Sequence, residues 1–260
     1  MEVVILPSPT DVGRVVADAI ALVLCRRAHP VLGLATGSSP VPVYDELVAR
    51  YSAGVLSFAE AAAFLLDEYV GLPAGHPQSY AVYIASVFTS RVDFTAGSVH
   101  APDGSARDLV AAAAAYEAAL VAGSGVDLQL LGIGGDGHIG FNEPGSSLAS
   151  RTRLKTLTQQ TRVDNARFFS SLDQVPRHVI TQGVGTILDA RHLVLVAWGS
   201  GKAAAVAAAV EGPVTAMVPA SALQLHPHVS VVLDEPAASS LRLADYYRET
   251  YANKPPWQGL

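Results

Sequence analysis

Two carboxylates and a histidine lie within eight positions of one glycine-rich segment, Gly135 to Pro144. They are Asp136, His138 and Glu143, and they follow an apolar stretch, Val126 to Leu131, that is typical of a short buried strand. A loop at the end of a strand can direct an acid, a base and an orienting group at one point. The segment therefore predicts a centre for proton transfer.

A second acidic pair, Asp67 and Glu68, follows another apolar run, Ala61 to Leu66, that predicts a strand. At least one of these carboxylates is expected at the carboxyl edge of a sheet. Partial desolvation raises the pKa of a carboxyl group there and suits it to moving protons. The alternative is a pair of acids that merely begins a helix, where negative charge is also favoured.

The segment Thr36 to Pro40 joins a predicted strand to a predicted helix. Gly37 allows a ligand to approach the backbone closely. Ser38 and Ser39 offer hydroxyl and N–H groups at a helix start, where the helix dipole favours an anion. This segment suits a phosphate group, and an ordinary helix N-cap is the alternative.

Two motifs that suggest nucleotide binding lack their essential partners. Gly132 to Gly137 fits G-x-G-x-x-G, but Pro144 interrupts any helix that would follow, as a dinucleotide site requires. Gly199 to Lys202 resembles the end of a P-loop, but Ala203 stands where Ser or Thr would bind magnesium. We therefore exclude nucleotide binding, although Lys202, at a helix start after a strand, can still contact a phosphate.

The composition favours a soluble protein that handles small molecules. Half of the 260 residues are hydrophobic and 15% are charged, so the chain can build a sizeable core. The net charge of −6 argues against nucleic acid as a partner. The single cysteine, Cys25, lies in an apolar helical pattern and is expected to be a buried thiol.

No metal site or membrane segment is predicted. The histidines and the cysteine lack metal-ligand spacing, and no apolar segment approaches the roughly 18 to 20 residues that span a bilayer. The N-terminus lacks the basic region of a signal peptide, so a cytoplasmic location is expected.

Short apolar runs alternate with helical patterns, which predicts one α/β domain with a mostly parallel sheet covered on both faces. Ligands of such sheets bind beyond the carboxyl ends of the strands. The predicted strands are Val3 to Leu6, Val31 to Ala35, Ala61 to Leu66, Leu128 to Leu131, Leu193 to Trp198 and Val229 to Leu233. The predicted helices are Thr10 to Arg27, Pro40 to Tyr51, Ser79 to Ser90, Ser105 to Gly123, Gly183 to Leu188, Gly201 to Val210 and Ser239 to Ala252, and Ser146 to Arg177 is expected to be loop plus helix.

These residues resemble the glucosamine-6-phosphate deaminase family nearly end to end. The matching blocks, in order, are Leu34 to Gly37, Leu66 to Leu72, His76 to Tyr80, Asp136 to Pro144, Ser146 to Arg153, Arg167 to Phe169, Gly183 to Thr186, Gly201 to Ala203 and Leu223 to Pro227. The resemblance implies a single-domain, Rossmann-like three-layer α/β fold over residues 1–260. It also implies conversion of glucosamine 6-phosphate and water to fructose 6-phosphate and ammonia, with no metal or organic cofactor.

The resemblance further implies a role for each candidate residue. His138, oriented and charged by Asp136 and Glu143, would open the sugar ring. Asp67 matches the family's base, which takes the proton from C2 and returns it to C1. The residues expected to hold the 6-phosphate are Gly37, Ser38, Ser39, Arg167 and Lys202.

The sequence leaves open whether the protein is regulated and whether it forms an oligomer. Some members of the family are activated by N-acetylglucosamine 6-phosphate at an allosteric site between subunits of a homo-oligomer. Ser146, Arg153 and Lys155 match the phosphate contacts of that site, with surface ion pairs as the alternative role. The region from Leu241 to Leu260 does not follow the pattern of the activated enzymes. Leu65 also departs, because many members have asparagine there.

Two other functions compete with deamination. A 6-phosphogluconolactonase shares the fold and the phosphate loop and would use His138 on a lactone, but the intact Asp67 to Tyr69 block favours the deaminase. A sugar-phosphate-sensing module would carry a DNA-binding segment, and the N-terminus is not basic. The sequence does not distinguish glucosamine from galactosamine substrates.

Overall fold

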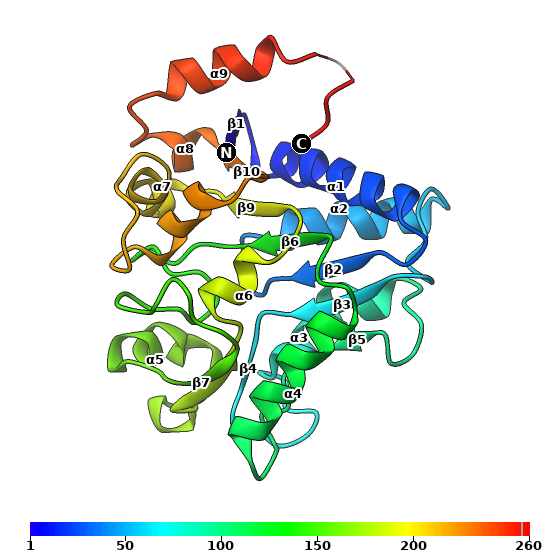
Figure 1. The fold of residues 1–260 in the computed structure, drawn as a ribbon, viewed down its shortest axis with the longest axis vertical. Coiled ribbons are helices and arrows are strands. Elements are labelled where there is room, and N and C mark those ends of the chain that lie inside the picture. Colours follow the sequence, from blue (N-terminus) through cyan, green and yellow to red (C-terminus); the bar gives the residue numbers. More distant parts are fainter. Residues whose placement is uncertain (256) are drawn as a thin grey trace.

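The computed structural model describes residues 1–255 and 257–260 and is built around one large parallel sheet (Figure 1). Its seven strands lie in the order β1 (Glu2–Leu6), β10 (Val229–Asp234), β9 (Leu193–Ala197), β6 (Leu128–Leu131), β2 (Val31–Leu34), β3 (Ala62–Leu65) and β5 (Val99–His100). Every neighbouring pair in this sheet is parallel. The predicted α/β fold with a mostly parallel central sheet is confirmed.

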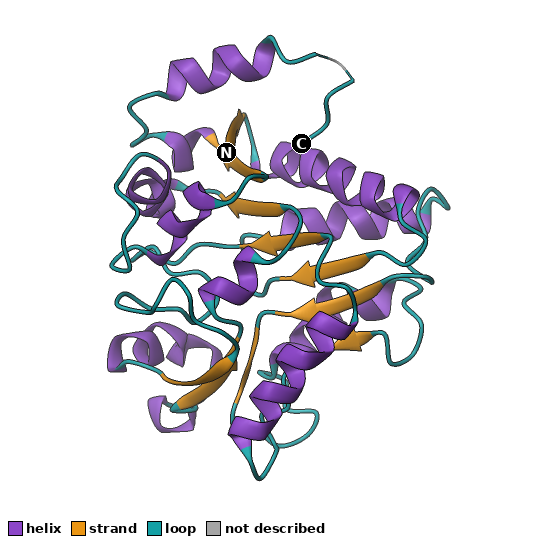
Figure 2. Cartoon of the chain, in the orientation of Figure 1, coloured by secondary structure: helices purple, strands orange, loops and turns teal. Residues whose placement is uncertain are grey.

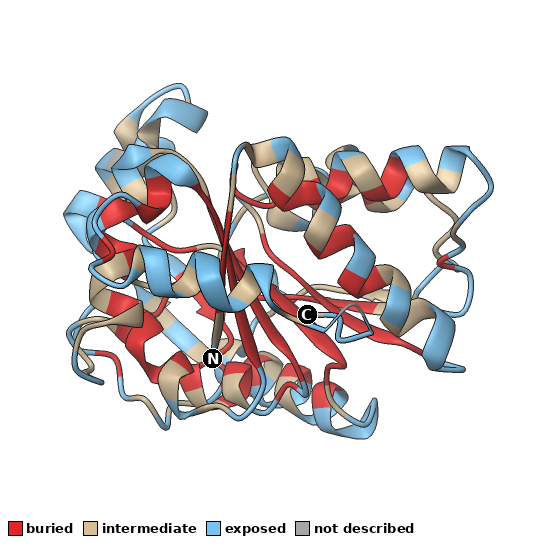
Figure 3. Cartoon of the chain, turned by 90° about the horizontal axis from the view of Figure 1, so that it is seen from above, coloured by how far each residue is buried: buried red, intermediate tan, exposed pale blue. Residues whose placement is uncertain are grey.

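Helices cover both faces of this sheet (Figure 2). One face carries α1 (Pro9–Arg26), α2 (Val41–Ser52) and α3 (Tyr80–Val87), and the other carries α4 (Leu109–Ala122), α6 (Val184–Leu188), α7 (Ala203–Val210) and α8 (Glu235–Ala238). Successive strand residues alternate between the two cores: Val194 faces the first and Leu195 the second. The strands are consequently buried on both sides (Figure 3), which explains their uninterrupted apolar sequences.

The strand order reverses between β2 and β6. The chain runs outward from β2 to β3 and β5 and then returns to place β6 on the other side of β2. A crevice opens where the two connections diverge, beyond the carboxyl ends of these strands. The loop with Gly37 follows β2 and the loop with His138 follows β6, so both loops border this crevice.

The structure adds a small antiparallel sheet that the sequence patterns do not predict. Its strands are β4 (Asp67–Tyr69), β8 (His178–Thr181) and β7 (Arg153–Thr156), in that order. The segment Asp67 to Tyr69, expected as a loop or helix start, is therefore a strand. Ser146 to Arg177, expected as loop plus helix, contains β7 before α5 (Gln159–Asn165). Pairing with β8 fixes the two carboxylates of β4 in place.

The remaining elements differ from expectation mainly at their ends. Asp108 caps α4 through its side chain, so this helix begins at Leu109 instead of Ser105. The last helix, predicted from Ser239 to Ala252, is α9 (Ala244–Ala252) and begins five residues later, while the short α8 precedes the predicted range. Short 3₁₀ helices are η1 (Thr89–Arg91), η2 (Ala166–Phe168), η3 (Leu172–Gln174), η4 (Ser200–Lys202) and η5 (Pro219–Leu225).

Cys25 is exposed, so its prediction as a buried thiol is wrong. The buried stripe of α1 runs through Val12, Val16 and Ile20 at four-residue spacing. Cys25 lies one residue past the continuation of this stripe, which turns its side chain about 100° away from the core. Among the described residues, no helix is both long and apolar enough to cross a membrane.

Candidate active site

A cavity of about 400 Å³ lies at the carboxyl ends of β2, β3 and β6, within the size range of small-molecule sites. It gathers residues that are far apart in the sequence. The predicted site residues in its lining are Gly37, Ser38, Ser39, Asp67, His138, Arg167 and Lys202. Lining residues that the sequence did not single out as site residues include Tyr80, Gly140, Phe141, Thr161 and Asn165.

Asp67 supplies the buried carboxylate of the cavity. It follows Leu66 directly, opposite Thr181 of β8, and only 4% of it is exposed. Burial, and then the nearby charge of Glu68, raises the pKa of Asp67 to about 8. A carboxyl group with a pKa near neutrality can both accept a proton and return it.

Gly140 lies beside both Asp67 and Thr181. The backbone of Gly140 has a φ of +54°, and a Cβ atom added there would lie 3.5 Å from Oδ2 of Asp67 and 3.1 Å from Oγ1 of Thr181. A side chain at this position would be strained by the positive φ and would press on the hydroxyl of Thr181, while it would only touch the carboxylate. The glycine therefore brings the His138 loop close to β4 and β8.

His138 faces the cavity with its ring held from behind. Its Nδ1 atom lies 2.6 Å from Oδ1 of Asp136, and the same oxygen accepts the backbone N–H of His138 at 3.2 Å. The hydrogen bond from His138 lowers the pKa of Asp136, which keeps this carboxylate charged. A carboxylate at Nδ1 favours the tautomer with hydrogen on Nδ1, so that Nε2 is left as the proton acceptor.

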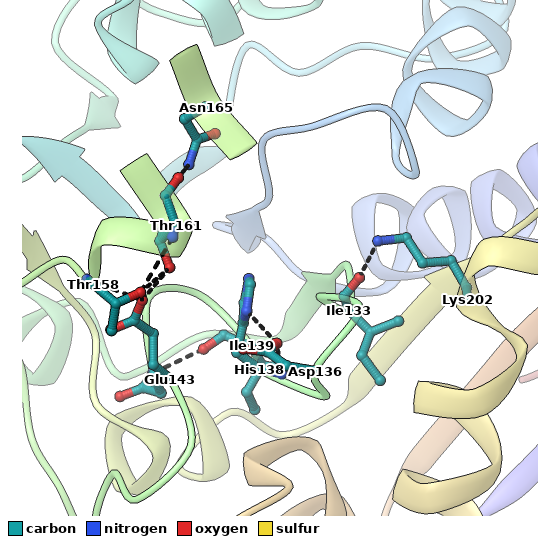
Figure 4. A network of polar contacts seen from close by, with 10 residues as sticks. Ile133, Asp136, His138, Ile139, Glu143, Thr158, Thr161, Asn165 and Lys202 are labelled. Carbon is teal, nitrogen blue, oxygen red and sulfur yellow. Dashed lines mark hydrogen bonds and ion pairs between the residues drawn. The ribbon is translucent and has the colours of Figure 1, made fainter. Parts of the chain in front are cut away.

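Glu143 contacts a helix instead of His138. Its carboxylate accepts a hydrogen bond from Oγ1 of Thr158 at 3.0 Å and another from Thr161 (Figure 4). A bridge between Ile139 and Asn142 turns the chain between His138 and Glu143, which separates the two side chains. The structure thus joins Asp136 to His138, as expected, and places Glu143 at the start of α5, the helix that brings Thr161 and Asn165 to the cavity.

Two cations, Arg167 and Lys202, line the cavity. Lys202 Nζ donates to the carbonyl of Ile133 at 2.7 Å. Partial burial, and then the positive charge of Arg167, lowers the pKa of Lys202. Two cations that repel each other across a cavity are stabilised by an anion between them.

The loop after β2 adds uncharged hydrogen-bond donors to the lining of the cavity. Gly37 has a φ of +91°, and nothing lies within 4 Å of where its Cβ atom would be. No side chain caps α2, so the helix N-cap suggested for the two serines does not form. Ser38 and Ser39 therefore border the cavity at a helix start where backbone N–H groups are available.

The candidate allosteric residues also lie together, outside this cavity. Lys155 Nζ is 3.4 Å from Oγ of Ser146. Arg153 and Lys155 occupy alternate positions of β7 and are both partly buried. Burial lowers the pKa of Arg153. Among the side chains that the structure describes, neither cation forms an ion pair with a carboxylate, whereas nearby Arg151 pairs with Glu117 and Asp189.

Leu65 is fully buried in the core beneath α1 and α2, and it is Leu66 that lines the cavity. The backbone carbonyl of Leu65 accepts hydrogen bonds from Tyr116 at 2.6 Å and from Gln182 at 3.0 Å. Within the described side chains, no group of three or more His, Cys, Asp and Glu residues is arranged to hold a metal ion.

The fold and the cavity define a class of α/β proteins that take a small anionic ligand at the carboxyl edge of a parallel sheet. The chain belongs to the family described as glucosamine-6-phosphate isomerases/6-phosphogluconolactonase, whose profile matches residues 9–232. Family membership agrees with the resemblance seen in the sequence.

Similar proteins extend over the whole chain. A glucosamine-6-phosphate deaminase of Mycolicibacterium smegmatis is 64% identical over 261 residues and one of Streptomyces coelicolor is 59% identical, each covering 100% of both chains. A solved structure described as a monomeric glucosamine-6-phosphate deaminase is 40% identical, covers 92% of this chain and 100% of its own, and has a TM-score of 0.90. A 6-phosphogluconolactonase from Trypanosoma cruzi shares the fold at 20% identity and a TM-score of 0.71, covering 93% of this chain and 97% of its own.

Proposed function

We propose that the cavity carries out aldose–ketose isomerisation coupled to deamination. The protein is a glucosamine-6-phosphate deaminase, converting glucosamine 6-phosphate and water to fructose 6-phosphate and ammonia. The observation that supports this chemistry best is the buried carboxylate of Asp67, which shares a cavity with His138 and with two cations. Hydrolysis of a lactone requires no base at a carbon atom, so Asp67 favours the deaminase over the lactonase.

In the proposed sequence of steps, His138 Nε2 transfers the proton of the anomeric hydroxyl to the ring oxygen, which opens the sugar. Asp67 then takes the proton from C2 while the C1 oxygen gains a proton from the substrate's ammonium group, which forms an enolamine. Returning the first proton to C1 moves the double bond to C2 and nitrogen. Water adds to C2 of this imine and ammonia leaves, which yields the ketose. Asp136 orients the imidazole ring, and Glu143 holds α5 against the cavity.

The direct test is ammonia release from purified protein, measured with glucosamine 6-phosphate and with its galactosamine epimer. Lactone hydrolysis is measured in parallel on 6-phosphogluconolactone. Rapid ammonia release with a lactonase rate at background supports the proposal, and the reverse pattern contradicts it. The ratio of the two ammonia rates gives the epimer preference.

We propose that Arg167 and Lys202, with the loop of Gly37, Ser38 and Ser39, bind the 6-phosphate. Charge-assisted contacts of this kind contribute about 1.5 to 3 kcal/mol each. Replacing Arg167 or Lys202 with methionine is therefore expected to raise KM for the phosphorylated substrate about tenfold or more. Unphosphorylated glucosamine, as the control substrate, should react equally poorly with wild type and variants. An unchanged KM excludes that residue from the phosphate site.

We also propose that Ser146, Arg153 and Lys155 form a second anion site that responds to N-acetylglucosamine 6-phosphate. An effector at this site acts only if it binds one state of the protein better than another. Initial rates are expected to depend sigmoidally on substrate and to become hyperbolic with the effector, and Arg153→Ala should abolish this response. Hyperbolic kinetics that ignore the effector would leave these residues with a structural role.

Residues 1–260 are proposed to act as one domain, because both hydrophobic cores share the same central sheet. A response to the effector would favour a homo-oligomer, whereas the 40% identical relative is described as monomeric. The cytoplasmic location stays a prediction.

A further inference from the structure

Glu68 is a buried carboxylate that the proposed mechanism does not use. It lies next to Asp67 on β4, and only 6% of it is exposed. Neighbouring residues of a strand point to opposite faces, so Glu68 points away from the face that Asp67 presents. A buried carboxylate is retained at a position only when its charge is well compensated, and this one is compensated by the backbone.

Four hydrogen bonds hold Glu68, and they come mainly from the start of one helix. Oε1 accepts the N–H groups of Tyr69 at 2.8 Å and Tyr80 at 3.0 Å. Oε2 accepts the hydroxyl of Ser79 at 2.7 Å and the N–H group of Ala81 at 2.9 Å. Ser79 is the N-cap of α3, so the carboxylate sits at the positive end of this helix.

These contacts stabilise the carboxylate form and leave it no freedom to turn. Donated hydrogen bonds and the helix dipole both favour a negative charge at this point. The charge is then held at a fixed position one residue from Asp67, within an interior where screening by water is weak. A like charge at such a position disfavours ionisation of its neighbour.

We propose that Glu68 is a positioning residue that holds a permanent negative charge behind Asp67 and thereby makes Asp67 a stronger base. Because this inference rests on Asp67 as the base of the proposed function, the test must separate the two. The helix start has two effects here: it stabilises the charged form of Glu68, and through Glu68 it fixes the geometry of β4 against α3.

Other ionisable groups near Asp67 do not replace Glu68 in this role. Tyr69 on β4, Tyr80 on α3 and Tyr116 on α4 each interact electrostatically with Asp67, but burial raises the pKa of each of these phenols. They are therefore neutral over the working pH range. His138, Arg167 and Lys202 share the cavity with Asp67, and positive charge on any of them would make Asp67 a weaker base.

The test begins with the wild-type enzyme. The carboxyl groups of Asp67 and Glu68 are titrated by ¹³C NMR, with assignments made by through-bond correlation of each carboxyl carbon to its own backbone in the wild-type protein. The proposal requires that Glu68 stays ionised throughout the range in which Asp67 takes up its proton. A Glu68 that gains a proton in that range, or that is neutral throughout, overturns it, and this result needs no variant to be stable.

The Glu68→Gln variant then removes the charge and keeps the size. We expect the pKa of Asp67 to fall by about one unit, and the acid limb of kcat/KM to move to lower pH by the same amount. At high pH, where Asp67 is ionised in both enzymes, kcat should be lower in the variant because the base is weaker. Glu68→Asp, which keeps the charge, should keep the wild-type pH profile.

The matched control is Glu117→Gln. Glu117 on α4 also accepts several hydrogen bonds, from Thr152 and Thr186, and lies away from the cavity. Its loss should lower Tm without moving the pH profile. If Glu68→Gln lowers Tm but leaves the pKa of Asp67 unchanged, the role of Glu68 is structural and the inference fails. If the pKa of Asp67 falls while the acid limb of kcat/KM stays in place, Glu68 acts as inferred and Asp67 is not the base.

Discussion

Asp67→Asn enzyme is expected to lose both ammonia release and the exchange of the C2 hydrogen with deuterated solvent. The variant keeps the size of the side chain but removes the carboxylate that is proposed to take the C2 proton. A positioned base contributes about 10²- to 10⁴-fold to the rate, so a loss of at least this size is expected in kcat. KM should change little, because Asp67 is not among the residues proposed to bind the 6-phosphate.

The control for this variant is Asp127→Asn. Asp127 is also buried, but it pairs with Arg27 and Arg191 away from the cavity. Its replacement should lower Tm and leave C2 exchange intact. If exchange at C2 continues at the wild-type rate in Asp67→Asn, another residue is the base.

The pH dependence of activity provides a second check on Asp67. Its pKa is raised to about 8, so the carboxylate form that is proposed to act as the base is lost as the pH falls below that value. The kcat/KM of the wild-type enzyme should therefore rise with pH to a plateau above about 8. A profile without an acid limb between pH 6 and 9 would contradict the assignment.

The same shift links Asp67 to stability with a definite sign. The unfolded chain ionises at the ordinary pKa of 3.8, whereas the folded protein holds the proton up to about 8. The free energy of unfolding contributed by this group therefore falls as the pH rises from 4 to 8. The Asp67→Asn variant does not suffer this fall in the free energy of unfolding. The Tm of the variant should therefore exceed that of wild type by an amount that grows with pH and levels off above 8. The structure thus predicts a variant that is more stable and inactive.

The central sheet and the main cavity loops are the parts that the sequence predicts well. Strands such as β9 are apolar at every position because both of their faces are buried, and this pattern is legible without a structure. The parallel arrangement then places the loops with Gly37 and His138, and the segment that begins at Asp67, at one edge. The apolar runs and the rule that ligands bind at the carboxyl edge of a parallel sheet are together sufficient to predict this part of the site.

The small antiparallel sheet cannot be predicted from apolar runs in the same way. Strand β4 has the sequence Asp-Glu-Tyr. It pairs with β8, where Thr181 lies opposite Asp67 although the two residues are far apart in the chain. Strands of three or four residues with charged side chains carry too little apolar pattern to be recognised. The sequence of β7 alternates basic and uncharged residues, Arg-Leu-Lys-Thr, and the structure half-buries the basic ones, which is the opposite of the apolar alternation that predicts a strand.

Local sequence patterns also do not identify the hydrogen-bond partners of Glu143. Sequence proximity suggested that Glu143 acts on His138, but the turn at Gly140 separates them, and Thr158 and Thr161 provide the hydroxyl groups. Such contacts depend on how α5 packs over the cavity. Tyr80, Thr161 and Asn165 line the cavity for the same reason, and uncharged side chains of this kind give no signal in a single sequence.

His138→Gln should impair ring opening selectively. The Nδ1 atom of His138 is bound to Asp136, so Nε2 is the atom that can move a proton between the anomeric hydroxyl and the ring oxygen. With glucosamine 6-phosphate, kcat/KM is expected to fall about 10²- to 10⁴-fold. The test substrate is an analogue without hydroxyl groups at C4 and C5, which cannot close a ring and needs no opening. Wild type and variant should exchange its C2 hydrogen at similar rates.

Asp136→Asn distinguishes orientation of His138 from a separate role in the reaction. The amide keeps the size of Asp136 but presents no negative charge to the imidazole, so the favoured tautomer and the ring orientation are lost together. We expect the same pattern as in His138→Gln, a large loss on the cyclic sugar and a small loss on the open-chain analogue, and no further loss in the double variant. Equal losses on both substrates would mean that His138 also acts after the ring has opened, in the steps assigned here to Asp67.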